Sequence, residues 1–102
     1  MTDSEHEKKS GLPIPPLKVV YSGRVQGVGF RWTCQRISKR HAVTGTVKNL
    51  ADGTVELFAD GEPDEVQRFL SEIEAKMHGN LRDIHITPAE ESQTFRTFQI
   101  LR

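Results

Sequence analysis

The chain has 102 residues, with 14 Lys and Arg against 14 Asp and Glu, so its formal net charge is zero. This length leaves room for one domain, and the charge balance removes the usual electrostatic argument for broad nucleic-acid binding. The single cysteine, Cys34, excludes an internal disulfide and a cysteine zinc site. The four histidines are scattered without metal-ligand spacing, so we expect neither a metal nor a cofactor.

The N-terminal sequence predicts a tail and no targeting segment. No apolar run approaches the ~20 residues of a membrane span, and no secretory apolar region follows Met1. We therefore expect a cytoplasmic protein that does not bind membranes. Residues 1–16 are polar and then proline-rich, which predicts a flexible tail. The prolines of this tail serve either as a stiff linker or as a ligand for a partner. A single domain is predicted over residues 17–102.

A glycine-rich loop follows the first predicted strand, residues 17–22. Gly23, Gly27 and Gly29 allow positive φ and close backbone approach, so consecutive N–H groups can point into one concavity. Such a nest, opening onto a helix N-terminus, favours an anion. Arg31 stands where the helix begins, and its guanidinium can bind two oxygens of a phosphate or carboxylate. The loop predicts an oxyanion cradle, or alternatively a plain connection between two elements.

The helix predicted over residues 30–41 has apolar positions at helical spacing, namely Phe30, Cys34 and Ile37. Cys34 lies on this apolar side and is interpreted as core rather than as a nucleophile. The opposite side is basic. These cations either add positive field near the cradle or form a solvated face that complements the helix dipole. They are Arg36, Lys39 and Arg40.

The remaining elements complete one fold pattern. Residues 43–49 and 54–60 alternate and are joined by an Asp-Gly turn, which predicts a hairpin. Residues 63–77 form an amphipathic helix that Gly79-Asn80 ends, and strands follow at 81–87 and 95–101, with His85 facing outward. The apolar stripe of that helix is Val66, Phe69, Leu70, Ile73 and Met77. We predict an α+β, ferredoxin-like split β-α-β sandwich: a mostly antiparallel sheet of four to five strands with two helices on one face.

Two motifs carry a resemblance to a known family. The string Gly-Arg-Val-Gln-Gly-Val-Gly-Phe-Arg, residues 23–31, resembles the signature loop of the acylphosphatases. Residues 45–49, Gly-Thr-Val-Lys-Asn, followed by Gly53, Val55 and Gly61, resemble the family's second signature. The resemblance covers residues 18–102. It departs at Thr46, where the family usually has an aromatic residue, and at Tyr21, where it has an aliphatic one.

The resemblance implies hydrolysis of the carboxyl–phosphate bond of acyl phosphates, giving a carboxylate and inorganic phosphate without a metal. By position, Arg31 binds the phosphate and Asn49 positions the attacking water. An amide can hold water, and the arginine and the N–H nest can stabilise the phosphoryl oxygens. Inorganic phosphate is then the product and an inhibitor, and we expect a monomer. The phosphate-binding residues so implied are Val25, Gln26, Gly27, Val28, Gly29, Phe30 and Arg31.

Other interpretations remain open from the sequence. Neither motif contains a histidine or carboxylate, so we hypothesise that a substrate oxygen accepts the water proton. Arg31 could instead pair with an acidic neighbour, and Asn49 could be an ordinary turn residue. The domain could bind phosphate as a regulatory module without turnover. It could also bind RNA through Tyr21 and Phe58, although no nucleic acid is expected. A segment of larger metalloenzyme-maturation proteins is a further alternative, but those proteins carry cysteine zinc motifs and this chain has a single cysteine.

Overall fold

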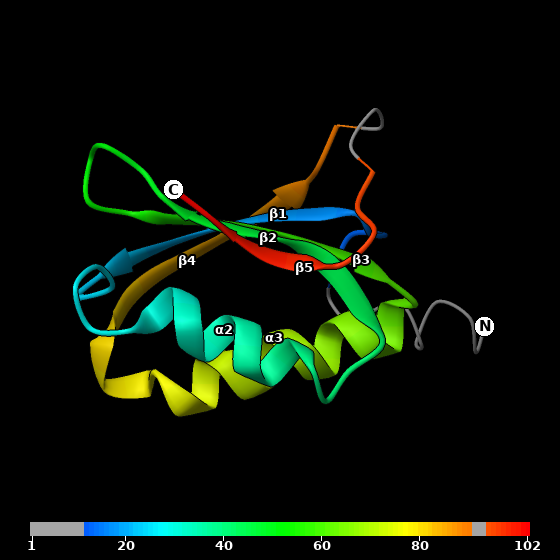
Figure 1. The fold of residues 1–102 in the computed structure, drawn as a ribbon, viewed down its shortest axis with the longest axis horizontal. Helices are drawn as coiled ribbons and strands as arrows, with labels where there is room; N and C mark the ends of the chain where they lie inside the picture. Colours follow the sequence, from blue (N-terminus) through cyan, green and yellow to red (C-terminus); the bar gives the residue numbers. More distant parts are fainter. Residues whose placement is uncertain (1–11, 91–93) are drawn as a thin grey trace.

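The computed structural model describes residues 12–90 and 94–102 (Figure 1). In this part of the chain, the sheet has five strands in the order β4-β1-β3-β2-β5. Three neighbouring pairs are antiparallel and the pair β2–β5 is parallel. The elements are β1 (Leu17–Gly23), α2 (Phe30–Ser38), β2 (Val43–Asn49), β3 (Val55–Gly61), α3 (Pro63–Lys76), the short 3-10 helix η1 (His78–Asn80), β4 (Leu81–Pro88) and β5 (Phe98–Leu101).

Both helices cover the same face of the sheet, as predicted (Figure 1). Alternate residues of β1, β2 and β3 face the helices and are buried, because successive side chains of a strand point to opposite faces. The predicted apolar stripe of α3 is buried against them. Burying each large apolar side chain contributes about 1.5–3 kcal/mol before the loss of conformational entropy. The predicted α+β, ferredoxin-like class is confirmed.

Tyr21 and Phe58 lie on opposite faces of the sheet. Tyr21 is buried under the helices and packs edge-on against Phe30, with ring centroids 4.9 Å apart. Loss of solvent raises the pKa of its hydroxyl well above the ordinary value. Phe58 is half-buried on the face without helices and stacks on Phe95 at 5.8 Å. The suggestion that Tyr21 could stack on RNA bases is therefore wrong, because the ring is inside the core.

Two predicted boundaries differ from the structure. Helix α2 ends at Ser38, three residues earlier than predicted. The amides of the next residues bond to carbonyls three positions back, for example Arg40 N–H to Ile37 O at 2.9 Å, so the chain tightens into turns. Strand β5 begins at Phe98 and not at residue 95. The side chain of Phe95 contacts the open face of the sheet before the strand starts.

Of the tail predicted over residues 1–16, residues 1–11 lie outside the described part of the chain. Leu12 is partly buried and packs against the core. The amide of Ala89 donates a hydrogen bond to the carbonyl of Pro16 at 2.9 Å. The last residues before β1 are therefore attached to the domain near the end of β4.

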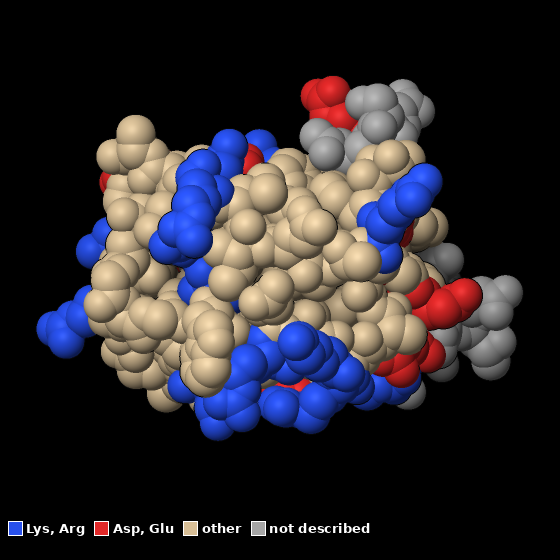
Figure 2. All heavy atoms as spheres, in the orientation of Figure 1, with Lys and Arg blue, Asp and Glu red and all other residues tan. Residues whose placement is uncertain are grey.

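The balanced charges are not spread evenly over the face seen in Figure 2. Lys and Arg side chains gather along the lower edge of this view, where Figure 1 has α2 and α3. Acidic side chains gather instead at the end where α3 begins. The helical layer thus has a basic edge although the net charge is zero.

Candidate active site

The glycine loop between β1 and α2 is fixed at its start by the end of η1 and the start of β4. Arg24 donates its amide to the carbonyl of Asn80 at 2.8 Å, and Asn80 Nδ2 donates back to the carbonyl of Arg24 at 3.1 Å. Gly23 has φ +124° and packs so closely that an added Cβ would lie 2.4 Å from the oxygen of Asn80. Only glycine fits there, so the loop leaves β1 in one defined direction.

Gln26 fixes the other side of the loop to the β2–β3 turn. Its Nε2 donates to the carbonyl of Leu50 and to the carbonyl of Thr54, both at 2.8 Å. Strand β2 ends at Asn49, immediately before this turn. The side chain of Gln26 therefore holds the glycine loop beside Asn49, a role that differs from the main-chain contact predicted for this residue.

The loop ends at the N-terminus of α2. Gly29 is the N-cap and has φ +79°, a left-handed conformation that costs other residues roughly 1–2 kcal/mol. The first intrahelical bond runs from Thr33 N–H to Gly29 O at 2.9 Å, and the amides before it have no intrahelical partner. No acidic side chain lies in the first turn. The positive end of the helix dipole is therefore available to an anion.

A hollow of about 230 Å³ lies where the loop, the start of α2, the end of β2 and the end of β5 meet. It brings together most of the predicted site residues from both motifs. The loop and helix supply Val25, Gly27, Gly29, Phe30, Arg31 and Trp32, and the strands and C-terminus supply Asn49, Ile100 and Arg102. Gln26 and Val28 do not line this hollow, and Val28 is exposed to solvent.

Arg31 is held by the last strand and not by an acidic partner. Its Nη1 donates to the carbonyl of Leu101 at 3.0 Å. None of the four ion pairs found within residues 12–90 and 94–102 includes Arg31. A guanidinium carries five N–H donors, so one bond to β5 orients the group and leaves donors for a ligand. The alternative that Arg31 simply pairs with a neighbouring carboxylate is not what the structure shows.

Asn49 has an oxygen that the protein leaves unpaired. Within the described residues, its Oδ1 is the one buried side-chain polar atom without a hydrogen-bond partner. Leaving such a group unsatisfied costs about 1–3 kcal/mol. An ordinary turn asparagine would bond to the backbone nearby. Asn49 thus lines the hollow and has a buried oxygen that no other protein group holds.

Comparison with known proteins decides the family. The model of the family described as Acylphosphatase matches residues 17–100. The acylphosphatase of Lacticaseibacillus paracasei is 36% identical over 85 residues, covering 81% of this chain and 91% of that protein. The chain belongs to the acylphosphatase family. The fold and the class of enzyme predicted from the sequence are confirmed, and the non-catalytic module is not favoured.

Solved structures of this family superpose on the chain. The acylphosphatase of Bacillus subtilis gives a TM-score of 0.73 at 30% identity and covers 84% of this chain and 97% of that one. The HypF protein of T. kodakarensis gives a TM-score of 0.74 at 26% identity. That match covers 84% of this chain but 12% of HypF, so the likeness is to one segment of a longer protein.

Three of the residues that line the hollow were not identified from the sequence. Ile100 and Arg102 arrive there because β5 pairs in parallel with β2, where Val47 lies opposite Ile100. That pairing joins segments about fifty residues apart and has no local signature. Trp32 directly follows Arg31 and is 56% exposed. An aromatic side chain next to the expected phosphate ligand was a signal that could have identified it.

The single cysteine of the chain lies away from the hollow. Cys34 is fully buried, and loss of solvent raises the pKa of its thiol far above the ordinary value, which fits the core role predicted for it. Within the described residues, no group of three or more His, Cys, Asp or Glu side chains is placed to hold a metal ion.

Over the same residues, no helix combines the length and apolarity needed to cross a membrane.

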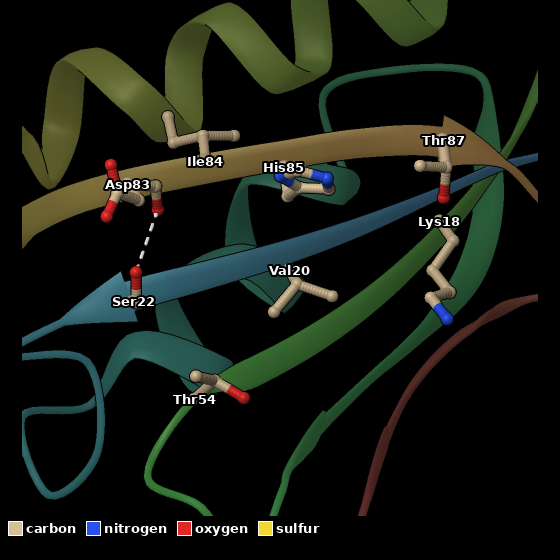
Figure 3. Close-up of a pocket in the computed structure, with 8 residues that line it drawn as sticks. All are labelled: Lys18, Val20, Ser22, Thr54, Asp83, Ile84, His85 and Thr87. Atoms are coloured by element: carbon tan, nitrogen blue, oxygen red, sulfur yellow. Dashed lines mark hydrogen bonds between the residues drawn. The ribbon is translucent and has the colours of Figure 1, made fainter.

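A larger hollow, about 530 Å³, lies on the face of the sheet without helices (Figure 3). It contains neither Arg31 nor Asn49. Its side chains stand on paired strands, for example Lys18 opposite Thr87 and Ser22 opposite Asp83. Because the main-chain N–H groups of β1 are used in pairing with β3 and β4, this hollow offers no nest of free donors. The smaller hollow is therefore the candidate active site.

Proposed function

We propose that the protein hydrolyses the carboxyl–phosphate bond of acyl phosphates, with Arg31 and the N–H groups of the glycine loop as phosphate ligands. The observation that carries this proposal is that one hollow is lined by the loop, Arg31 and Asn49. Preorganised donors aimed at phosphoryl oxygens stabilise the charge of the transition state. The family membership supports the choice of acyl phosphates as the substrate class.

In the proposed mechanism Asn49 holds the attacking water. Asn49 lines the hollow, and its carboxamide holds the water by hydrogen bonds so that a lone pair of the water oxygen is directed toward phosphorus. The oxygen–phosphorus bond to water forms as the bond to the carboxylate breaks, and the carboxylate is a good leaving group. None of the residues that line the hollow is a histidine, aspartate or glutamate. A phosphoryl oxygen of the substrate therefore accepts the proton.

Further expectations go with this function. Inorganic phosphate, the product, occupies the same cradle and inhibits competitively. The reaction needs no metal, because the arginine and the main-chain donors supply the charge stabilisation. We also expect the protein to act as a monomer in the cytoplasm.

The test is a turnover assay with purified protein in the presence of a chelator. We expect hydrolysis of benzoyl phosphate and not of a phosphate monoester. Arg31→Ala should lower kcat/KM by about 10³-fold or more, as loss of a phosphoryl-binding arginine does elsewhere. Arg24→Ala is the matched control, because it removes a guanidinium from the same loop at a position that does not line the hollow. Near wild-type kcat/KM in the Arg31 variant would refute the proposal.

A further inference from the structure

Trp32 separates the hollow of the active site from a second, smaller one. It lies in the first turn of α2 and lines both hollows. The second hollow has a volume of about 100 Å³. Trp32 is 56% exposed to solvent. A large apolar side chain so exposed at the edge of a site is available to contact a ligand. The other residues of this second hollow are Thr33, Arg36, Ile37, Arg40 and Lys76.

This second hollow is cationic. Three of its six lining residues are basic and none is acidic. Arg40 pairs with Glu72, whereas Arg36 and Lys76 take part in none of the ion pairs of the described residues. The basic edge of the helical layer seen in Figure 2 follows the same two helices.

Arg36 is oriented by Trp32. Its guanidinium carbon lies 4.7 Å from the centroid of the indole ring, a cation–π arrangement that holds the group over the ring. Arg36 and Lys76 lie in the last turns of α2 and α3, where cations also complement the helix dipoles. The dipole accounts for the presence of charge there. It does not account for an exposed tryptophan or for the convergence of both helices on one hollow.

The two hollows together fit a molecule with two charged ends. A phosphoryl group held by Arg31 leaves the rest of the substrate at the edge formed by Trp32. Residues four apart on a helix are neighbours, separated by roughly one turn of 5.4 Å, so Arg36 lies about one turn beyond Trp32, which itself lines the hollow of Arg31. Resting on the function proposed above, we propose that Trp32 contacts the acyl carbons and that Arg36 binds an anionic group at the far end of the acyl part.

The proposal names a substrate class: acyl phosphates whose acyl group carries a second anion. The matched substrates are 4-carboxybenzoyl phosphate and 4-methylbenzoyl phosphate, which are similar in shape and differ in the distal charge. We expect kcat/KM to be about tenfold higher for the carboxylate, the gain of one charge-assisted contact in a partly exposed site. Equal kcat/KM for the two substrates would overturn the proposal.

Variants distinguish a specific contact between Arg36 and the distal anion from a general electrostatic attraction by the basic residues of the helices. Arg36→Gln should reduce the preference for the carboxylate to within about twofold, whereas Trp32→Ala should raise KM for both substrates. Lys39→Gln is the control, because Lys39 follows the same helix but lines neither hollow. It should keep the preference. If Lys39→Gln reduced the preference as much as Arg36→Gln, the effect would be a diffuse field and the proposal would be wrong.

A binding measurement distinguishes failure of this inference from failure of the proposed function. The probes are the two matching phosphonates, in which a methylene replaces the bridging oxygen, so that neither is hydrolysed. Trp32 is the single tryptophan, and its fluorescence reports binding at the edge it forms. If neither acyl phosphate is turned over, the proposed function fails. Tighter binding of the carboxylate phosphonate, about tenfold and dependent on Arg36, would still support the site, and equal binding would overturn it.

Discussion

The side chain of Gln26 gives the sharpest test of how this active site is assembled. Its amide joins the glycine loop to the turn that follows Asn49 through two hydrogen bonds of 2.8 Å. Gln26→Met keeps most of the side-chain volume and removes both bonds. The variant therefore changes the attachment of the loop without changing any group that lines the hollow.

The loss of stability can be estimated from these contacts. Each neutral hydrogen bond contributes about 0.5–1.5 kcal/mol. The two carbonyls keep other partners, since the oxygen of Thr54 accepts the amide of Leu50 at 2.8 Å and the oxygen of Leu50 accepts the amide of Gly53 at 3.2 Å. Neither is left unsatisfied, so we expect the free energy of unfolding to fall by about 1–3 kcal/mol. For a domain of this size that lowers Tm by about 4–24 °C.

The effect of Gln26→Met on catalysis follows from the position of the glycine loop relative to Asn49. A displacement of about 1 Å between reacting groups can cost about 10²-fold in rate. Gln26→Met should lower kcat for benzoyl phosphate by about 10- to 100-fold, because the phosphate held by the loop moves relative to Asn49. The inhibition constant of phosphate should change little, since Arg31 and the loop amides remain. Urea unfolding, steady-state kinetics and phosphate inhibition measure the three quantities.

Gln35→Met is the matched control. Gln35 also donates its Nε2 to a backbone carbonyl, that of Phe98, but at 3.4 Å and away from the glycine loop. It should cost less stability and leave kcat unchanged. If Gln26→Met lowered the stability as expected but left kcat intact, Gln26 would hold the fold and not the geometry of the site.

Two further predictions concern pH. Hydrogen bonding to Arg40 lowers the pKa of the Glu72 carboxyl in the folded state. The contribution of Glu72 to stability is therefore present above the ordinary pKa of a glutamate and is lost as pH falls through the lowered value. In urea unfolding, Glu72→Gln should destabilise the protein at neutral pH and much less at about pH 3. If a substrate oxygen accepts the water proton, the plot of kcat against pH should show no step from an enzyme carboxylate or histidine; a steep loss of kcat at one such pKa, removed by mutating a single acidic residue, would contradict the proposed mechanism.

Local patterns in the sequence were sufficient for most of the elements and for the glycine turn before α2. The burial of Val66, Phe69 and Ile73 followed from helical spacing, and the positive φ of Gly27 and Gly29 followed from their place in a turn before a helix. These features depend on neighbours within a few residues. They are therefore readable from one sequence without knowledge of the tertiary structure.

Contacts between distant segments could not be predicted in the same way. The amide of Gln26 bonds to backbone carbonyls, which every residue possesses, so no side-chain type marks its partners. The parallel pairing of β5 with β2 brings Leu101 to Arg31 and Arg102 to the hollow, and strand order is a property of the whole sheet. The early end of α2 at Ser38 depends on backbone turns that the apolar spacing does not show.

Thr46, the departure from the family's usual aromatic, lies on the face without helices. It pairs across the sheet with Phe58 and Gln99. Asn49 belongs to the other alternation of the same strand. The departure therefore changes packing on the open face and leaves the wall of the hollow unaltered.

The most direct test of the account is the kinetic behaviour of Asn49→Ala, because the central claim is that this residue directs water at a phosphoryl group bound by others. The variant should lose about 10²- to 10³-fold in kcat for benzoyl phosphate, as loss of a single preorganised polar group does elsewhere, while the inhibition constant of inorganic phosphate stays within about threefold of the wild type. Retained kcat, or a loss of phosphate binding as large as the loss of kcat, would show that Asn49 does not hold the attacking water.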